Sequence, residues 1–200
     1  PPTVRPGTAG KPVVTVLDGA MSIAWTAPAT GGAVGDYVVQ RATSAAGPYV
    51  AVTSGSCASH PLTVTTCTVT GLTNGTSYYF KVVASNAAGT SPASLRSLKA
   101  RAAASPGAVG GPTCTKVTTR TVLGAAKVAW GAAASNGSTV TRYEFSYKRS
   151  SSATWGGWTS NMTRRTLSLT GLTKGAGYDV RVRAVNVLGV GPTGSCSVTA

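Results

Sequence analysis

The sequence predicts an all-β protein built from two tandem copies of one domain. Residues 71–86 and 171–186 both begin with Gly-Leu-Thr-x-Gly, and the offset is half of the 200-residue chain. A period this long is too long for a solenoid repeat and indicates two complete domains. After each turn, apolar and polar residues alternate with the period of a half-buried strand. No helical period is sustained, and the many Gly, Thr, Ser and Val residues are typical of short strands joined by tight turns.

Three landmarks recur in the same order in each half. An early tryptophan lies on a short apolar strand, a tyrosine opens the next strand, and a Leu-to-Tyr corner follows. They are Trp25, Tyr37 and Tyr78 in the first half and Trp130, Tyr143 and Tyr178 in the second. In this pattern the chain resembles a pair of fibronectin type III domains over nearly its whole length. The resemblance implies two immunoglobulin-like β-sandwiches, with Trp25, Trp130, Tyr78 and Tyr178 in the cores.

Composition places the expected domain boundaries. Residues 1–11 are expected to form an N-terminal arm or linker, residues 12–100 domain 1, residues 101–112 a short Ala/Gly/Pro-rich linker, and residues 113–200 domain 2. About one hundred residues per domain is the usual size of such a sandwich. The Ala-, Gly- and Thr-rich composition suggests a bacterial or phage source and an extracellular or surface protein.

The four cysteines fall two per domain. A bridge between Cys57 and Cys67 would close a short loop in domain 1. In the resembled fold, Cys114 and Cys196 lie on first and last strands whose edges come near each other. Even pairing within each domain indicates an oxidising, extracellular setting. Zinc binding is the alternative, but no Cys-x-x-Cys occurs and His60 is the only histidine. We therefore expect neither a metal nor a cofactor.

Catalysis is not expected. The chain has four carboxylate side chains, Asp18, Asp36, Glu144 and Asp179, and each is predicted to be a turn or surface residue. His60 has no evident acidic partner in the sequence. General acid and base chemistry needs such groups within hydrogen-bond reach of the reacting atoms. There is also no Gly-x-Ser-x-Gly elbow and no phosphate-binding glycine loop.

Charge is the most unusual property of the composition. The formal net charge is +14, of which residues 1–100 contribute +4 and residues 101–200 contribute +10. Strand alternation places several cations on the outward faces of two strands of domain 2, and in the resembled fold these two strands are neighbours in one sheet. Glu144 and Asp179 on the same faces offset part of this charge. Two further arginines are expected at the other sheet or its edge. The resulting basic panel comprises Arg142, Lys148, Arg181, Arg183, Arg164 and Arg165.

Two interpretations of the basic panel remain open. It is either a solvated face that keeps the protein soluble, or a surface for an anionic partner. Such a partner would be an acidic wall polymer, nucleic acid bound without sequence specificity, or an acidic protein surface. Sequence-specific nucleic-acid recognition is poorly supported because Tyr143, Tyr147 and Tyr178 are expected to be buried and not to stack on bases.

Two other surfaces are candidates for contacts. In domain 1, Val38, Tyr79 and Val83 are predicted to form an exposed patch that contacts another protein or domain. In domain 2, Trp158 corresponds to Tyr49 and is expected to be partly structural. Trp155 has no counterpart in domain 1. It would either stack on a sugar ring or anchor a partner, or it would cap the edge of the sandwich.

Three functions fit these features. The leading one is a non-catalytic extracellular module that spaces, displays or attaches, with domain 2 facing an anionic surface or polymer. The second is a repeating, self-associating subunit or decoration of a filament, phage tail or surface appendage. The third is the accessory region of a secreted polysaccharide-degrading enzyme. Membrane insertion is not expected, because no stretch approaches the roughly twenty apolar residues that a membrane span needs. The expected location is extracellular, at the cell surface or on a virion.

Overall fold

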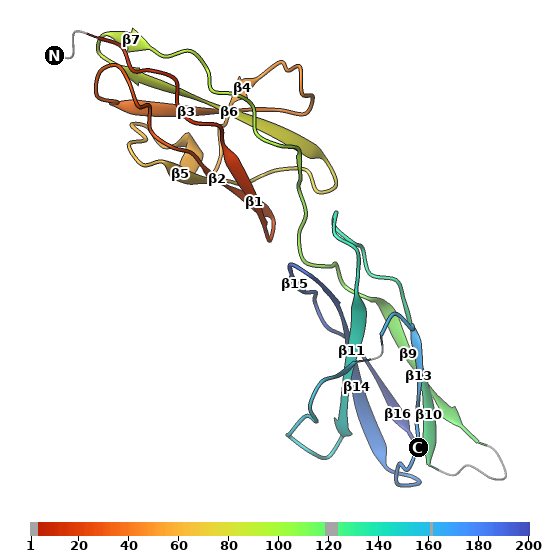
Figure 1. The fold of residues 1–200 in the computed structure, drawn as a ribbon. Helices are drawn as coiled ribbons and strands as arrows, with labels where there is room; N and C mark the ends of the chain where they lie inside the picture. Colours follow the sequence, from red (N-terminus) through yellow and green to blue (C-terminus); the bar gives the residue numbers. More distant parts are fainter. Residues whose placement is uncertain (1–3, 119–123, 161) are drawn as a thin grey trace. The chain divides into compact units, whose positions relative to one another are not determined.

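The chain forms two compact β units, residues 1–104 and residues 105–200. Figure 1 shows them in a computed structural model, which describes residues 4–118, 124–160 and 162–200. Each unit consists of two antiparallel sheets (Figure 1). In the described part of the chain, the helical structure is a single 3-10 turn, η1 (Ser56–Ala58). The all-β prediction with two sandwiches is therefore confirmed.

In domain 1, a three-stranded sheet has the order β1-β2-β5, and a second sheet has the order β4-β3-β6-β7. Strand β8 pairs with β6. The strands of the first sheet are β1 (Val13–Leu17), β2 (Ala20–Ala24) and β5 (Thr66–Val69). Those of the second are β3 (Asp36–Ala42), β4 (Val50–Ala51), β6 (Ser77–Asn86), β7 (Gly89–Thr90) and β8 (Ala100–Arg101). Alternate residues of these strands, such as Ile23 and Phe80, are fully buried in the core.

Domain 2 repeats this arrangement with sheets β13-β10-β9 and β12-β11-β14-β15, and β16 pairs with β14. The first sheet contains β9 (Gly110–Val117), β10 (Ala125–Gly131) and β13 (Thr166–Leu169). The second contains β11 (Arg142–Arg149), β12 (Thr159–Ser160), β14 (Gly177–Asn186), β15 (Gly189–Val190) and β16 (Gly194–Thr199). The core of domain 2 is formed by alternate residues of β10 and β14, of which Val128, Val180 and Val182 are fully buried.

The landmark aromatic residues lie inside the sandwiches. Trp25 and Trp130 are each 6% exposed and pack edge-on against the tyrosine that opens the next strand, with ring centroids 5.3 and 5.7 Å apart. The hydroxyl oxygens of Tyr78 and Tyr178 accept hydrogen bonds from the backbone N–H groups of Thr73 and Thr173, at 3.1 and 3.0 Å. Each corner tyrosine thus fixes the turn that precedes its own strand.

The expected N-terminal arm is not separate from domain 1 over its described residues, 4–11. Gly7 and Gly10 donate backbone hydrogen bonds to the carbonyls of Thr30 and Thr26. Ala9 is buried in the core of the domain. Residues 1–3 of the predicted arm lie outside the described residues. Composition cannot show that this Pro- and Gly-rich backbone pairs with residues 26–30 of the same domain.

The expected linker, residues 101–112, is also largely structured. Ala102 and Ala103 are buried in domain 1, and Val109 belongs to the core of domain 2. Strand β9 begins at Gly110, within the predicted linker. The two ends of the predicted linker therefore belong to the two domains.

Both predicted disulfides are formed. Cys57–Cys67 joins η1 to β5, with Cα atoms 5.0 Å apart. Cys114–Cys196 joins β9 in one sheet to β16 in the other, with Cα atoms 5.6 Å apart. The second bridge therefore ties together the two sheet edges of domain 2.

The final segment of domain 1 differs from its counterpart in domain 2. Where β16 is a regular strand, residues 91–98 follow a period of three set by Ser91, Ser94 and Ser97. The backbone N–H of each serine donates to a carbonyl of β6, and its Oγ accepts from the N–H of the same β6 residue, at 2.9–3.0 Å. All three serines are buried. This serine segment was missed by the sequence analysis, although its three-residue spacing is visible in the sequence.

Candidate functional site

The carboxylates of domain 1 take part in local structure. His60 does have an acidic partner, contrary to expectation, since its Nδ1 lies 2.9 Å from Oδ2 of Asp36. The other Asp36 oxygen accepts a 2.6 Å hydrogen bond from the backbone N–H of Leu62. The sequence could not reveal the pair because the two residues are 24 positions apart. The pair therefore joins the loop that carries His60 to the first residue of β3.

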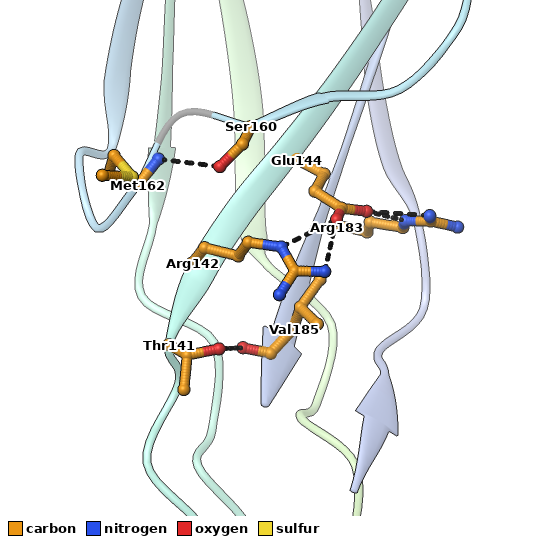
Figure 2. A network of polar contacts seen from close by, with 7 residues as sticks. All are labelled: Thr141, Arg142, Glu144, Ser160, Met162, Arg183 and Val185. Carbon is orange, nitrogen blue, oxygen red and sulfur yellow. Dashed lines mark hydrogen bonds and ion pairs between the residues drawn. The ribbon is translucent and has the colours of Figure 1, made fainter. Parts of the chain in front are cut away.

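Glu144 was expected at the surface, but it is only 9% exposed. It lies between two arginines, as Figure 2 shows. Arg142 donates to Oε1 from Nε and Nη2 at 2.9 and 2.8 Å, and Arg183 donates to Oε2 in the same way at 2.9 and 2.8 Å. Burial alone would raise the pKa of Glu144, but the hydrogen bonds from Arg183 and Arg142 outweigh it and hold the pKa below its ordinary value.

A loop lies over the outer face of the sheet that carries Glu144. Strand β12 pairs with β11 at Glu144–Ser160 and Phe145–Thr159. The residues just before β12 carry Trp155 and Trp158 over the outward side chains of β14. Along β14 the residues expected to point outward do alternate with buried ones as far as Ala184, but alternation could not show that a loop lies over them.

The indoles and the cations of this face alternate in a stack. Lys148 Nζ lies 5.4 Å from the ring centroid of Trp155, and the Arg181 guanidinium carbon lies 4.3 Å from the same centroid. The Trp158 centroid is 4.5 Å from the guanidinium carbon of Arg181 and 3.9 Å from that of Arg183. Contacts at these distances are attractive because the cation faces the negative side of the ring quadrupole. We call Lys148, Trp155, Arg181, Trp158 and Arg183 the cation–indole stack.

Trp155 and Trp158 are therefore interleaved with the basic residues, which the sequence analysis did not foresee. The Trp155 ring already contacts two cations, so a sugar ring would have to compete with them for its faces. In domain 1 the counterpart of Trp158 is Tyr49, whose ring centroid lies 4.5 Å from Nζ of Lys81. Because Lys81 and Arg181 stand at equivalent positions of β6 and β14, the two domains share a cation–aromatic contact at this place.

The cations of the stack differ in how they are paired. Arg183 is bound to Glu144, and Lys148 Nζ lies 3.6 Å from Oδ2 of Asp179 and donates to the carbonyl of Ser152. Hydrogen bonds from Ser150 and Ser197, followed by the charge of Lys148, lower the pKa of Asp179. Arg181 has no hydrogen-bond or carboxylate partner in the described ranges, and its Nε is buried and unsatisfied. Arg181 is thus the stacked cation that is left without an acceptor.

The remaining residues of the basic panel lie elsewhere. Arg164 and Arg165 are exposed and precede β13, on the sheet opposite to the stack. Tyr147 was expected to be buried but is 39% exposed. It lies on the inward face near the end of β11, where the core ends, and its ring is 6.4 Å from that of Tyr178.

The apolar patch predicted for domain 1 is only half-exposed. Val38 pairs with Val83 across β3 and β6, and the Tyr79 ring lies 5.3 Å from the guanidinium carbon of Arg96. The large apolar side chains that are most exposed in domain 1 lie instead on the serine segment and on β1. They are Leu95 at 75%, Leu98 at 72% and Val13 at 67%.

The described residues contain no group of three or more potential metal ligands. They also contain no helix that is long and apolar enough to cross a membrane. All four cysteines are in disulfides.

Each of the two sandwiches contains one internal disulfide and one corner tyrosine bonded to the turn before its strand. These features define a tandem immunoglobulin-like β protein. The chain belongs to the fibronectin type III domain family, whose family model matches residues 11–98 and 107–199. Tandem domains of this family are typically non-catalytic structural or binding modules.

Two solved structures illustrate the similarity. The chicken CNTN1 FN1–FN3 domains are 18% identical with a TM-score of 0.47, and the match covers 96% of this chain and 66% of that chain. A segment of two fibronectin type III domains from chicken tenascin is 19% identical with a TM-score of 0.46, and the match covers 96% of this chain and 99% of that chain.

Proposed function

We propose that this protein is a secreted or surface-exposed attachment module that binds an anionic polymer through domain 2. The observation that carries the proposal is Arg181, which is held between two indoles and has no acceptor among the described residues. Stacking covers the faces of a guanidinium, and Nε of Arg181 is buried. The in-plane N–H groups left for phosphate, sulfate or carboxylate oxygens are therefore those of its two terminal nitrogens. The net charge of +14 adds long-range attraction for such a polymer.

The extracellular location in this proposal rests on cysteine pairing. Two disulfides and no free thiol are expected of an oxidising compartment. The attaching role rests on the family, whose tandem domains typically space or bind. The carboxylates Glu144 and Asp179 neutralise part of the panel, which leaves Arg181 as the contact expected to matter most.

The test is binding of linear polyphosphate to the full chain by isothermal titration calorimetry over a salt series, with neutral dextran as a control. Arg181→Gln should weaken binding about tenfold, the loss of roughly one charged hydrogen bond. Arg181→Lys should be intermediate because it keeps the charge but not the planar donors. A double variant, Arg164→Gln with Arg165→Gln, removes two exposed charges from the opposite sheet and should cost less than threefold.

Equal losses in the Arg181→Gln protein and the double variant would mean that only overall charge matters, which would overturn the assignment. Absence of polyphosphate binding at low salt would do the same. Light scattering on the same samples tests the alternative role of a repeating subunit. A large assembly that persists at high salt would favour that alternative, because screening weakens exposed charge contacts.

A further inference from the structure

The outer edge of β1 in domain 1 is open. Among the described strands, β1 pairs with β2 alone, so one row of its backbone groups faces away from the sheet. Its sequence, Val-Val-Thr-Val-Leu, has no charge and no proline, and Val13 and Leu17 are exposed on it. Natural edge strands are usually protected by charges, prolines or a covering segment. Within Val13–Leu17 there is neither a charge nor a proline, and no described strand covers this edge.

Domain 2 has such protection at the same position. Its first strand, β9, contains Pro112 and Lys116, and Cys114 bonds it to Cys196 of β16. Domain 1 has no disulfide there. In domain 1 the serine segment, which precedes the short strand β8, takes the place of most of β16. It turns its serines toward β6 and leaves Leu95 and Leu98 exposed.

A groove runs between this open edge and the serine segment. One hollow of about 240 Å³ is lined by Val13, Val14, Leu98 and Ala100, with Lys11 and Lys99 beside them. A second hollow of about 310 Å³ continues it past Leu98 to Leu95 and Arg96. The floor is apolar, and all the charged residues at the rim are cations.

The rim cations are available to a partner. Lys11 and Lys99 are exposed, and no carboxylate in the described ranges pairs with them. Arg96 packs against Tyr79, a contact that leaves its in-plane donors uncovered. Of the two carboxylates in domain 1, Asp36 is bound to His60 and Leu62, and Asp18 lies in the hairpin turn at the far end of β1.

We infer that this groove binds an extended segment of a partner protein, which adds to β1 as a strand and carries apolar side chains with acidic neighbours. The backbone of the segment would pair with the open edge, its apolar side chains would contact Leu98 and Val13, and its carboxylates would meet Lys11 and Lys99. A lipid surface would leave the backbone groups of β1 unpaired. A second copy of this chain would bring the same cations to the rim.

The probe is a labelled nine-residue peptide of alternating valine and glutamate, blocked at both ends and titrated into the full chain by fluorescence anisotropy. Two analogues are N-methylated, one at every valine and the other at every glutamate. Strand addition uses the N–H groups of one edge of the peptide, because successive N–H groups point to opposite sides. One analogue should therefore lose at least tenfold in affinity while the other retains it. The amide resonances of Val14 and Val16 should shift on binding.

Leu98→Ser should lower the affinity for the peptide at least fivefold. Val187→Ser, at an 82% exposed valine of domain 2, should leave this affinity unchanged. Arg181→Gln should also leave peptide binding unchanged, so this inference and the polymer proposal fail independently. Equal binding of the two methylated analogues, or no binding, would overturn the inference. So would capture of phosphatidylserine vesicles that Leu98→Ser abolishes, or dimers that Val13→Ser dissociates.

Discussion

Substitution of Ser94 by alanine should destabilise domain 1 far more than the loss of one hydroxyl suggests. Ser94 is 2% exposed, and its Oγ accepts from the N–H of Val82 at 2.9 Å and donates to the carbonyl of Leu95 at 2.9 Å. The Leu95 carbonyl belongs to an exposed residue and can turn to water. Val82 is fully buried on β6, so its N–H would lose its acceptor.

An orphaned buried N–H costs about 1–3 kcal/mol. With an m value of about 1–2 kcal/mol/M, the urea midpoint of domain 1 should fall by about 0.5–3 M. Amide exchange at Val82 gives a local measurement on the intact chain, and its protection should fall about 5- to 150-fold. Far-UV circular dichroism with a fit to two transitions separates the domains.

Ser56→Ala is the matched control. Ser56 Oγ also accepts from a strand N–H, that of Thr68, at 2.8 Å, but in an exposed position where water can replace it. This variant should lose less than about 1 kcal/mol. If Ser94→Ala lost no more than the control and Val82 kept its protection, the serine segment would not be holding β6 through its hydroxyls.

Three further outcomes are expected. Replacing Cys114 and Cys196 with serine should cost about 4–5 kcal/mol on the chain-entropy model, against about 3 kcal/mol for Cys57 and Cys67, and equal shifts in the melting curves would contradict this ordering. Because the pKa of Glu144 is lowered in the folded state, its contribution to stability is complete above the unfolded carboxyl pKa of about 4.3 and is lost as the pH falls through the folded value. Urea midpoints of domain 2 should therefore fall less between pH 6 and pH 2 in Glu144→Gln than in the wild type. Finally, Trp158→Leu should cost about 1–3 kcal/mol by removing two cation–π contacts, whereas Met162→Leu, at a 71% exposed side chain, should cost less than about 0.5 kcal/mol by the same denaturation measurement.

The candidate site could be predicted only in part. Alternation along β14 correctly placed Arg181 and Arg183 on the outward face. It could not show that Trp158 would lie against both of them, since the loop and the strand are more than twenty residues apart. For the same reason Glu144 was expected at the surface, although its two arginines and the covering loop make it one of the least exposed charges.

The sequence by itself determined the two tandem domains and the all-β class, because these features follow from the internal repeat, local alternation and turn chemistry. The core positions of the tryptophans and of the corner tyrosines came from the resemblance to fibronectin type III domains. Tertiary structure decided what covers each outward face. The pairing of His60 with Asp36, the docking of Ser94 on Val82 and the packing of the N-terminal segment against Thr26 and Thr30 all join residues far apart in the sequence. Periodicity predicts which way a side chain points, but it does not predict which distant segment packs against it. For this physical reason only the tertiary structure could show that Arg181 has no acceptor and that the edge of β1 has no partner strand among the described residues.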